Sequence, residues 1–224
     1  DDAGGEDAGG GRAGVVDFEG AVLATVADAL PDGGLLFAGS SMPVRDLDAF
    51  AGPRDREILA TGNRGASGID GSVSTTLGAA AATGRPAVAV LGDLALHHDM
   101  TGLRDAGRLG LDVVYVVIHN DGGGIFHFLP VREHEPAFER FFGTPHGLEF
   151  RPPAEMYGLE HRRLEPGGDG TVRAALETAL EEALDAGGPW LLVVPSDREG
   201  NRRRRGAVVE AAARAAGEAL AGGR

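Results

Sequence analysis

The stretch PAVAVLGDLALHHDMTGLRDAGRLGLDVVYVVIHNDGGG, residues 86–124, decides the fold. Two nearly continuous apolar runs, at 86–93 and 112–118, have the composition of strands that are buried on both faces of a sheet. The residues between them, at 99–110, form an amphipathic pattern that predicts a helix. A strand, a helix and a strand in this order predict two parallel strands that lie side by side through a right-handed crossover.

The same alternation of strands and helices continues on both sides of this unit. Further strands are expected at 34–39, 57–60 and 189–197, and further helices at 17–31, 40–50, 72–84, 171–184 and 206–221, with short helical turns around 138–142 and 154–157. We therefore predict an α/β fold, a doubly wound and mostly parallel sheet with helices on both faces. The first residues are rich in Gly, Ala and acids without periodicity, which predicts a flexible linker at 1–14 ahead of one domain at 15–224. A linker at this place, with no initial Met, suggests the C-terminal part of a longer protein.

The composition narrows the function. The 224 residues include 21 basic and 34 acidic ones, and the net charge of −13 argues against binding to nucleic acid or to acidic membranes. The absence of cysteine excludes disulfides and thiolate metal sites. No apolar run approaches the roughly 20 residues of a membrane span, and no signal-peptide pattern is present, so we expect a cytoplasmic protein. Every basic residue is an arginine. Adaptation of the surface to high salt and GC-rich codon usage both account for this composition.

Polar residues follow the two central strands at the point where each ends. Asp93 closes the first strand and Asn120 closes the second. Because the carboxyl ends of neighbouring parallel strands meet at one edge of the sheet, both side chains offer oxygen atoms at one place. Oxygen ligands suit a hard cation such as Mg²⁺, which usually keeps phosphate groups in its shell. The glycines at 122–124 are expected to expose a backbone carbonyl to the metal and N–H groups to a phosphate.

Each of these signals has a simpler interpretation. An aspartate at a strand end is often a helix N-cap, and Asn-Asp-Gly-Gly is most often a turn. The pairing of both signals after two apolar strands favours the metal site. The glycine patterns of dinucleotide-binding and P-loop proteins are absent from the sequence.

Four segments carry a resemblance to a known family. Gly92-Asp93 followed by Asn120 is similar to the Mg²⁺–diphosphate motif of thiamine-diphosphate enzymes. SSMPVRDLDAF, NRGASGIDG, GDLALHHDM and NDGGGIFHFLP resemble, in this order, the C-terminal domain of the MenD family. That family makes 2-succinyl-5-enolpyruvyl-6-hydroxy-3-cyclohexene-1-carboxylate in menaquinone biosynthesis. The resemblance covers residues from about 15 to 215 and leaves out the pyrimidine-binding and middle domains of the family.

The resemblance implies cofactors, substrates and site residues. It implies thiamine diphosphate with Mg²⁺ or Mn²⁺, 2-oxoglutarate and isochorismate as substrates, and a pyrimidine-binding domain of the same or another chain as partner, in a homodimer or homotetramer. The implied metal ligands are Asp93, Asn120 and the carbonyl of Gly122. The implied cofactor contacts also include Ile69, Gly92, Leu94 and Gly123. The implied substrate pocket consists of Ser41, Arg45, Arg64, Ile125, Phe126 and Leu129.

These residues also allow plainer roles. Arg45 and Arg64 are compatible with surface arginines, and Ile69, Ile125 and Phe126 with ordinary core. A metal site at His97, His98 or His119 is disfavoured, because no acid or third ligand has a suitable spacing. The run RRRR at 202–205 is expected to be a solvated connector or a contact between subunits rather than a phosphate site.

Two other functions compete with the synthase. One is another thiamine-diphosphate enzyme, similar to acetolactate synthase or to a 2-oxo acid decarboxylase, against which NRGASGIDG and the two arginines argue. The other is a non-catalytic cofactor-binding domain, which the absence of the pyrimidine-binding domain favours.

Overall fold

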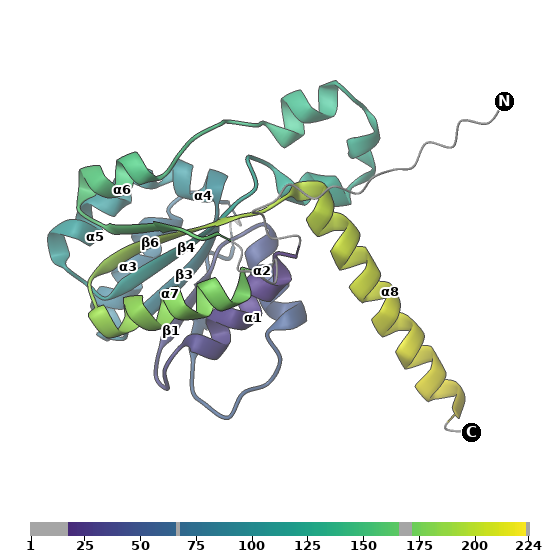
Figure 1. Cartoon of the computed structure of the whole chain (residues 1–224), viewed down its shortest axis with the longest axis horizontal. Coiled ribbons are helices and arrows are strands. Elements are labelled where there is room, and N and C mark those ends of the chain that lie inside the picture. The colour runs from purple at the N-terminus through teal and green to yellow at the C-terminus, as the bar shows by residue number, and fades with distance from the viewer. Residues whose placement is uncertain (1–17, 66–67, 166–171, 223–224) are drawn as a thin grey trace.

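A six-stranded parallel sheet forms the centre of the molecule (Figure 1). The computed structural model describes residues 18–65, 68–165 and 172–222. The strand order is β2-β1-β3-β4-β6-β5, and every pair of neighbours is parallel. The strands are β1 (Leu35–Ala38), β2 (Leu59–Thr61), β3 (Ala87–Gly92), β4 (Val113–His119), β5 (Glu160–Arg163) and β6 (Pro189–Pro195). The predicted parallel α/β sheet is confirmed.

Helices cover both faces of this sheet. One face packs on α1 (Gly20–Ala29) and α7 (Arg173–Ala186), with α2 (Met42–Phe50) beside α1. The other face packs on α3 (Ser72–Thr83), α4 (Asp93–His98), α5 (Leu103–Leu109) and α6 (Arg151–Tyr157). Alternate residues of each central strand serve the two layers, so that Val114 and Val116 face the first core and Tyr115 and Val117 the second. The predicted doubly wound arrangement is therefore confirmed.

The two strands that frame residues 86–124 pair directly. In the register of β3 and β4, Ala87 lies opposite Val113 and Gly92 opposite Ile118. Both strands consequently end at the same edge of the sheet, as the sequence predicts.

The strand order also contains a switch point beside β3. From β1 the chain moves outward to β2, and it then returns to place β3 on the other side of β1. In open α/β sheets, ligands bind in the crevice beyond the carboxyl ends of the strands at such a point. The loops that follow β1 and β3 meet there.

The structure adds several short elements to those expected from sequence. The chain between β3 and α5 forms α4 and the short helix η1 (Met100–Gly102). After β4 come η2 (Gly124–Phe128), η3 (Pro130–Glu133) and the π-helical turn η4 (Glu139–Gly143). The edge strand β5 was not expected, because its sequence EHRR has no apolar residue. The turns expected around 138–142 and 154–157 correspond to η4 and α6.

The last helix corrects an expectation. Helix α8 (Arg198–Gly222) begins eight residues before the predicted start at 206 and extends away from the sheet (Figure 1). Residues 202–205 are therefore helical and not a connector. Arg205 forms an ion pair with the buried Asp46 of α2, and its guanidinium lies over the rings of Phe50 and Phe128.

The linker expected at 1–14 lies outside the described residues. Among the described helices, none combines the length and the apolar character needed to cross a membrane.

Candidate cofactor and metal site

Asp93 stands at the junction of β3 and α4 and joins the ends of the two central strands. Its side chain is buried, with 1% of the residue exposed. The Oδ2 atom accepts N–H bonds from Asn120 at 3.0 Å and Gly122 at 3.2 Å, and Oδ1 accepts the N–H of Leu94 at 2.7 Å. The carboxylate thus fixes the backbone that follows β4 against the end of β3. One N–H bond leaves Oδ1 with capacity for a further interaction.

Asn120 presents an unused oxygen at the same edge. Its Nδ2 donates to Oε1 of Glu19 at 2.8 Å. Its Oδ1 is buried and has no hydrogen-bond partner among the described residues. A buried acceptor without a partner is costly and is commonly completed by a bound ion or water. The donor set therefore fits a hard cation that takes oxygen ligands, as the sequence predicts.

The glycines after Asn120 are required by close packing. Gly122 has φ +135°, and an added Cβ would lie 2.0 Å from the carbonyl oxygen of Gly143. A Cβ on Gly123 would lie 2.2 Å from the carbonyl oxygen of Phe142. Glycine is thus needed here because the turn η4 approaches the backbone. At Gly92, by contrast, an added Cβ would meet no neighbour within 4 Å, so this strand end borders open space.

One expectation about these glycines is wrong. The N–H groups of residues 122–124 were expected to be free for a phosphate. Instead they donate to Asp93 Oδ2, to the carbonyl of Gly143 and to the carbonyl of Gly122. The carbonyl of Gly122 keeps a second lone pair, so its predicted role as a metal ligand is compatible with this turn.

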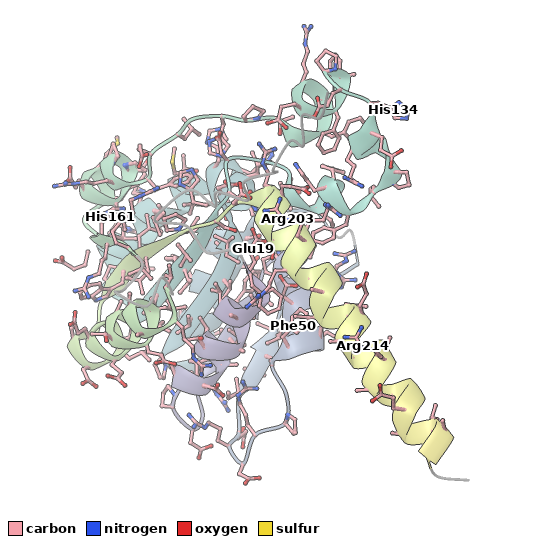
Figure 2. All side chains as sticks on the ribbon, turned by 45° about the vertical axis from the view of Figure 1, so that its right-hand side comes forward. Glu19, Phe50, His134, His161, Arg203 and Arg214 are labelled. Carbon is pink, nitrogen blue, oxygen red and sulfur yellow. The ribbon has the colours of Figure 1, made fainter. Side chains whose placement is uncertain are left out.

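The buried carboxyl group of Glu19 accepts the hydrogen bond from the Asn120 amide and is itself held by two neighbours. Oε1 of Glu19 also accepts the hydroxyl of Ser196 at 2.8 Å, and the backbone N–H of Glu19 donates to Oδ1 of Asn201 at 2.9 Å. Burial raises the pKa of Glu19, while the hydrogen bonds from Asn120 and Ser196 lower it. Figure 2 labels Glu19 within the body of the molecule, whereas Arg214 lies on the projecting part of α8.

Two histidines lie beside Asp93. The ligand atoms of Asp93, His119 and His146 lie within 4.8 Å of one another. The structure therefore brings an acid and a second histidine close to His119, although the sequence shows neither at a suitable spacing. However, Nδ1 of His146 accepts the N–H of Leu148, and Nδ1 of His119 lies 3.4 Å from the guanidinium of Arg163. A neutral ring whose Nδ1 accepts a hydrogen bond carries its proton on Nε2. Burial lowers the pKa of His119.

Protonated Nε2 atoms are donors and not metal ligands. Nε2 of His146 lies 3.3 Å from Oδ2 of Asp93, but this nitrogen, like Nε2 of His119, is buried and makes no hydrogen bond within the described part of the chain. A hard cation such as Mg²⁺ prefers the oxygen atoms of Asp93 and Asn120 to these ring nitrogens. The exposed His97 and His98 of α4 lie outside this cluster.

The loops after β1 and β2 touch each other. The hydroxyl of Ser40 donates to the carbonyl of Asn63 at 3.1 Å. Ser41 has φ 76°, which is rare for a residue with a side chain and is typical of functional turns. Arg45 is exposed and donates to the carbonyl of Ser41 at 2.5 Å. Arg64 is exposed in the second loop. Arg45 therefore lies at the start of α2, next to the loop after β1, and Arg64 lies in the adjoining loop after β2.

The predicted apolar residues lie in two places. Ile69 is half-buried against the core that contains α3, while Leu94 is half-buried in the first turn of α4. Ile125 and Phe126 are half-buried in η2, where the ring of Phe126 contacts that of Phe142 edge-on at 5.4 Å. Leu129 is 47% exposed and lines a groove of about 540 Å³ between η2, η3 and α8. Ile125 and Phe126 do not line this groove.

The sequence did not predict that Glu19 and His146 lie next to the proposed metal ligands. Glu19 belongs to the segment before α1, and His146 follows η4. Both are distant in sequence from Asn120 and Asp93, the residues next to which they lie. An acidic residue at the start of a helix commonly serves the helix dipole alone, so Glu19 carried no distinguishing signal.

Comparison with protein families matches residues 48–194 to the thiamine pyrophosphate enzyme family, C-terminal TPP binding domain. Several curated proteins named 2-succinyl-5-enolpyruvyl-6-hydroxy-3-cyclohexene-1-carboxylate synthase are similar to this chain. The protein of Halorubrum lacusprofundi is 49% identical over 192 residues, which are 84% of this chain and 31% of that protein. The protein of Rubrobacter xylanophilus is 49% identical over 180 residues, which are 80% of this chain and 30% of that protein.

The chain therefore spans about a third of the length of the curated relatives that it matches. Among solved structures, a protein of Mycobacterium smegmatis assigned to the thiamin diphosphate-dependent enzymes superposes with a TM-score of 0.60. It is 24% identical, and the match covers 80% of this chain and 32% of that one. At this identity the likeness supports the fold alone.

Proposed function

This chain belongs to the thiamine pyrophosphate enzyme family, whose C-terminal TPP-binding domain it matches over residues 48–194, and from this premise we propose that it is the cofactor-binding part of a 2-succinyl-5-enolpyruvyl-6-hydroxy-3-cyclohexene-1-carboxylate synthase. The proposed reaction joins decarboxylated 2-oxoglutarate to isochorismate. Identities between 42 and 53% to curated proteins of that name support this assignment. Because the chain spans about a third of those proteins, the activity, the substrates and the partners all belong to the proposal.

The observation that carries the proposal is the unpaired oxygen of Asn120 beside Asp93. Two oxygen donors at neighbouring strand ends suit Mg²⁺ or Mn²⁺, with the carbonyl of Gly122 as the third protein ligand. Such an ion would hold the diphosphate of the cofactor against this edge. Gly92, Leu94, Gly123 and Ile69 are the other proposed cofactor contacts.

Thiamine diphosphate, when bound, supplies the electron sink for the carbon–carbon chemistry. The residues of this chain bind and orient the substrates. Both proposed substrates carry carboxylates. Arg45, in the first turns of α2, and Arg64, in the loop after β2, offer exposed guanidinium groups for paired hydrogen bonds. Ser41, held in its unusual turn, offers a hydroxyl at the switch point.

Apolar side chains would complete the pocket. Ile125, Phe126 and Leu129 form the proposed wall that excludes water from the reacting groups. Leu129 is too exposed to be ordinary core, which supports a role in contact with a substrate or with another part of the protein.

The proposal includes further parts of the enzyme. A pyrimidine-binding domain of the same or another chain is the proposed partner, within a homodimer or homotetramer. The proposed compartment is the cytoplasm, since the substrates and the cofactor are charged metabolites that do not cross a bilayer unaided. The net charge of −13 argues against nucleic acid as a partner.

Product formation in the complete protein that contains this chain tests the proposal. We expect conversion of 2-oxoglutarate and isochorismate that depends on both thiamine diphosphate and Mg²⁺. Turnover of pyruvate in place of 2-oxoglutarate would instead indicate an enzyme similar to acetolactate synthase or to a decarboxylase. Cofactor binding without turnover of any 2-oxo acid would indicate a non-catalytic binding domain.

A further inference from the structure

We propose that Glu19 is a positioning residue that sets the orientation of the Asn120 amide, so that Oδ1 and not Nδ2 faces the metal site. The inference rests on the proposed function, because it assigns a role toward the cation of that site. Glu19 lies 101 positions before Asn120 in the chain and contacts it through one hydrogen bond of 2.8 Å.

The side-chain amide of Asn120 has two chemically different ends. Rotation by 180° about its last bond would exchange the oxygen, a metal ligand, for an NH₂ group, which repels a cation. The end that faces inward is therefore decisive. It meets Oε1 of Glu19, an acceptor, so the inward group has to be the NH₂ donor. The outward group is then Oδ1, the atom without a partner among the described residues.

The orienting contact does not depend on the charge of Glu19. A carboxylate oxygen accepts hydrogen bonds, and the carbonyl oxygen of a neutral carboxyl group does so as well. Oε1 already accepts two, from Asn120 and from Ser196. In either state the amide of Asn120 finds an acceptor at the inward end.

Glu19 is itself firmly held. The hydroxyl of Ser196, at the end of β6, and Oδ1 of Asn201, in the first turns of α8, fix its side chain and its backbone N–H. Only 1% of Glu19 is exposed, so water does not compete for Oε1. The interaction thus joins the start of α1, the end of β6 and α8 to a single predicted metal ligand.

The contact is tested by metal binding in the complete protein with saturating thiamine diphosphate. The probe is Mn²⁺, whose free concentration is followed by electron paramagnetic resonance. Glu19→Met keeps the length of the side chain and removes the acceptor. We expect it to weaken Mn²⁺ binding by about 10–100-fold, the usual effect of losing a residue that orients a metal ligand. Glu19→Gln keeps an acceptor oxygen and should restore the affinity to within about threefold of the wild type.

Two controls separate this contact from general damage and from the proposed function. Tyr115→Phe removes another buried side-chain hydrogen bond, from the hydroxyl to the carbonyl of Val73 in the other layer of the core, and should leave Mn²⁺ affinity nearly unchanged. Asp93→Ala removes a proposed ligand and should weaken binding strongly. Wild-type affinity in Glu19→Met, with weakened binding in Asp93→Ala, would overturn the role of Glu19 alone. Wild-type affinity in Asp93→Ala would overturn the metal site and this inference with it.

A second variant keeps the test decisive if Glu19→Met does not fold. The double change Glu19→Gln with Asn120→Asp exchanges donor and acceptor: the amide at position 19 donates to one carboxylate oxygen at position 120, and the other oxygen still faces the metal site. We expect Mn²⁺ binding within about threefold of the wild type. A folded double variant that does not bind Mn²⁺ would contradict the proposed orientation.

Discussion

Arg45 and Arg64 can be separated from the proposed cofactor site by experiment, because neither is among the hydrogen-bond partners that the described residues give to Asp93 and Asn120. If each pairs with a substrate carboxylate, Arg45→Ala and Arg64→Ala should lower kcat/KM by about 10–10³-fold, the loss of about 1.5–4 kcal/mol of charge-assisted bonding. The affinity for thiamine diphosphate, measured by calorimetry, should stay close to that of the wild type.

The opposite pattern would assign the arginines to the cofactor or to the fold. Loss of thiamine diphosphate binding in either variant, with an unchanged KM for both substrates, would contradict their role as substrate ligands. Arg85 offers a matched control, since it pairs with Glu57 and Gly33 at the opposite end of β1 and should be neutral for kcat/KM when changed to Ala.

A second prediction at this scale concerns the close packing at Gly122. Gly122→Ala would place a Cβ 2.0 Å from the carbonyl oxygen of Gly143 at a φ of +135°. We expect a loss of more than 1 kcal/mol, on the order of several, in the free energy of unfolding measured with urea. Gly78→Ala is the control, because an added Cβ in the middle of α3 meets no neighbour within 4 Å. It should stabilise the chain by about 0.5–1 kcal/mol. Equal effects of the two changes would refute the close approach of η4.

The site residues differ in how far the sequence predicts them. Asp93 and Asn120 were predictable because each follows a buried strand, and parallel strands bring their ends together without any knowledge of side-chain contacts. Glu19 and His146 were not, because their positions depend on how remote segments fold back onto that edge. The expectation of free N–H groups at 122–124 was wrong for the same reason, because these groups donate hydrogen bonds to acceptors that include Asp93 and η4.

The elements were predictable where apolar periodicity was strong. Strands β3, β4 and β6 are runs of valine, leucine and alanine, and their burial follows directly. Strand β5 has the sequence EHRR, and only its pairing with β6 makes it a strand. The start of α8 was placed too late because charged residues at 202–205 suggested solvent, whereas Arg205 enters the structure to meet Asp46.

The attachment of α8 to the sheet domain depends on this pair. Asp46 is fully buried, and Arg205 lies over Phe50 and Phe128 beside it. Arg205→Met should leave a buried carboxylate without its partner and cost about 3–5 kcal/mol in the free energy of unfolding. Adding Asp46→Leu to this variant should recover most of that loss, since no charge then remains buried. Urea unfolding of the two single variants and the double variant measures the coupling; strictly additive losses would contradict a direct pair.

The outer part of α8 is expected to contribute little to stability, in contrast to Arg205. Residues 209–222 are all exposed, and the alanines among them account for a helix that extends into solvent. Ending the chain after Glu210 should therefore change the free energy of unfolding by no more than about 0.5 kcal/mol. Ending it after Asp197 is the contrasting control, because it removes Arg205 and the contact of Asn201 with Glu19. A large loss of unfolding free energy in the chain that ends after Glu210 would show that the outer helix packs on the domain.

At the scale of the whole molecule, the predicted site residues gather at one open edge of the sheet. They come from the end of β3 and from the segments that follow β1, β2, β3 and β4, including the starts of α2 and α4, while the opposite ends of the strands carry none of them. Arg45 and Arg64 are exposed on this edge, and so is nearly half of Leu129. Under the proposed function, this edge would hold the anionic end of the cofactor but leave the reacting groups in contact with water.

This openness predicts that residues 1–224 do not catalyse the proposed reaction without the rest of the enzyme. Carbon–carbon bond formation of this class needs a pocket from which water is excluded, and the exposed arginines and Leu129 have to be covered before they enclose a substrate. The remaining two thirds of the length of the curated relatives are the proposed source of that cover. We expect no product from 2-oxoglutarate and isochorismate with this chain, thiamine diphosphate and Mg²⁺, and turnover once the remaining part is supplied in the same chain or separately. Binding of Mn²⁺ to the complete protein, weakened by Asp93→Ala, serves as the control that the cofactor edge is intact. Sustained turnover by residues 1–224 alone would refute the argument, because the open edge would then suffice.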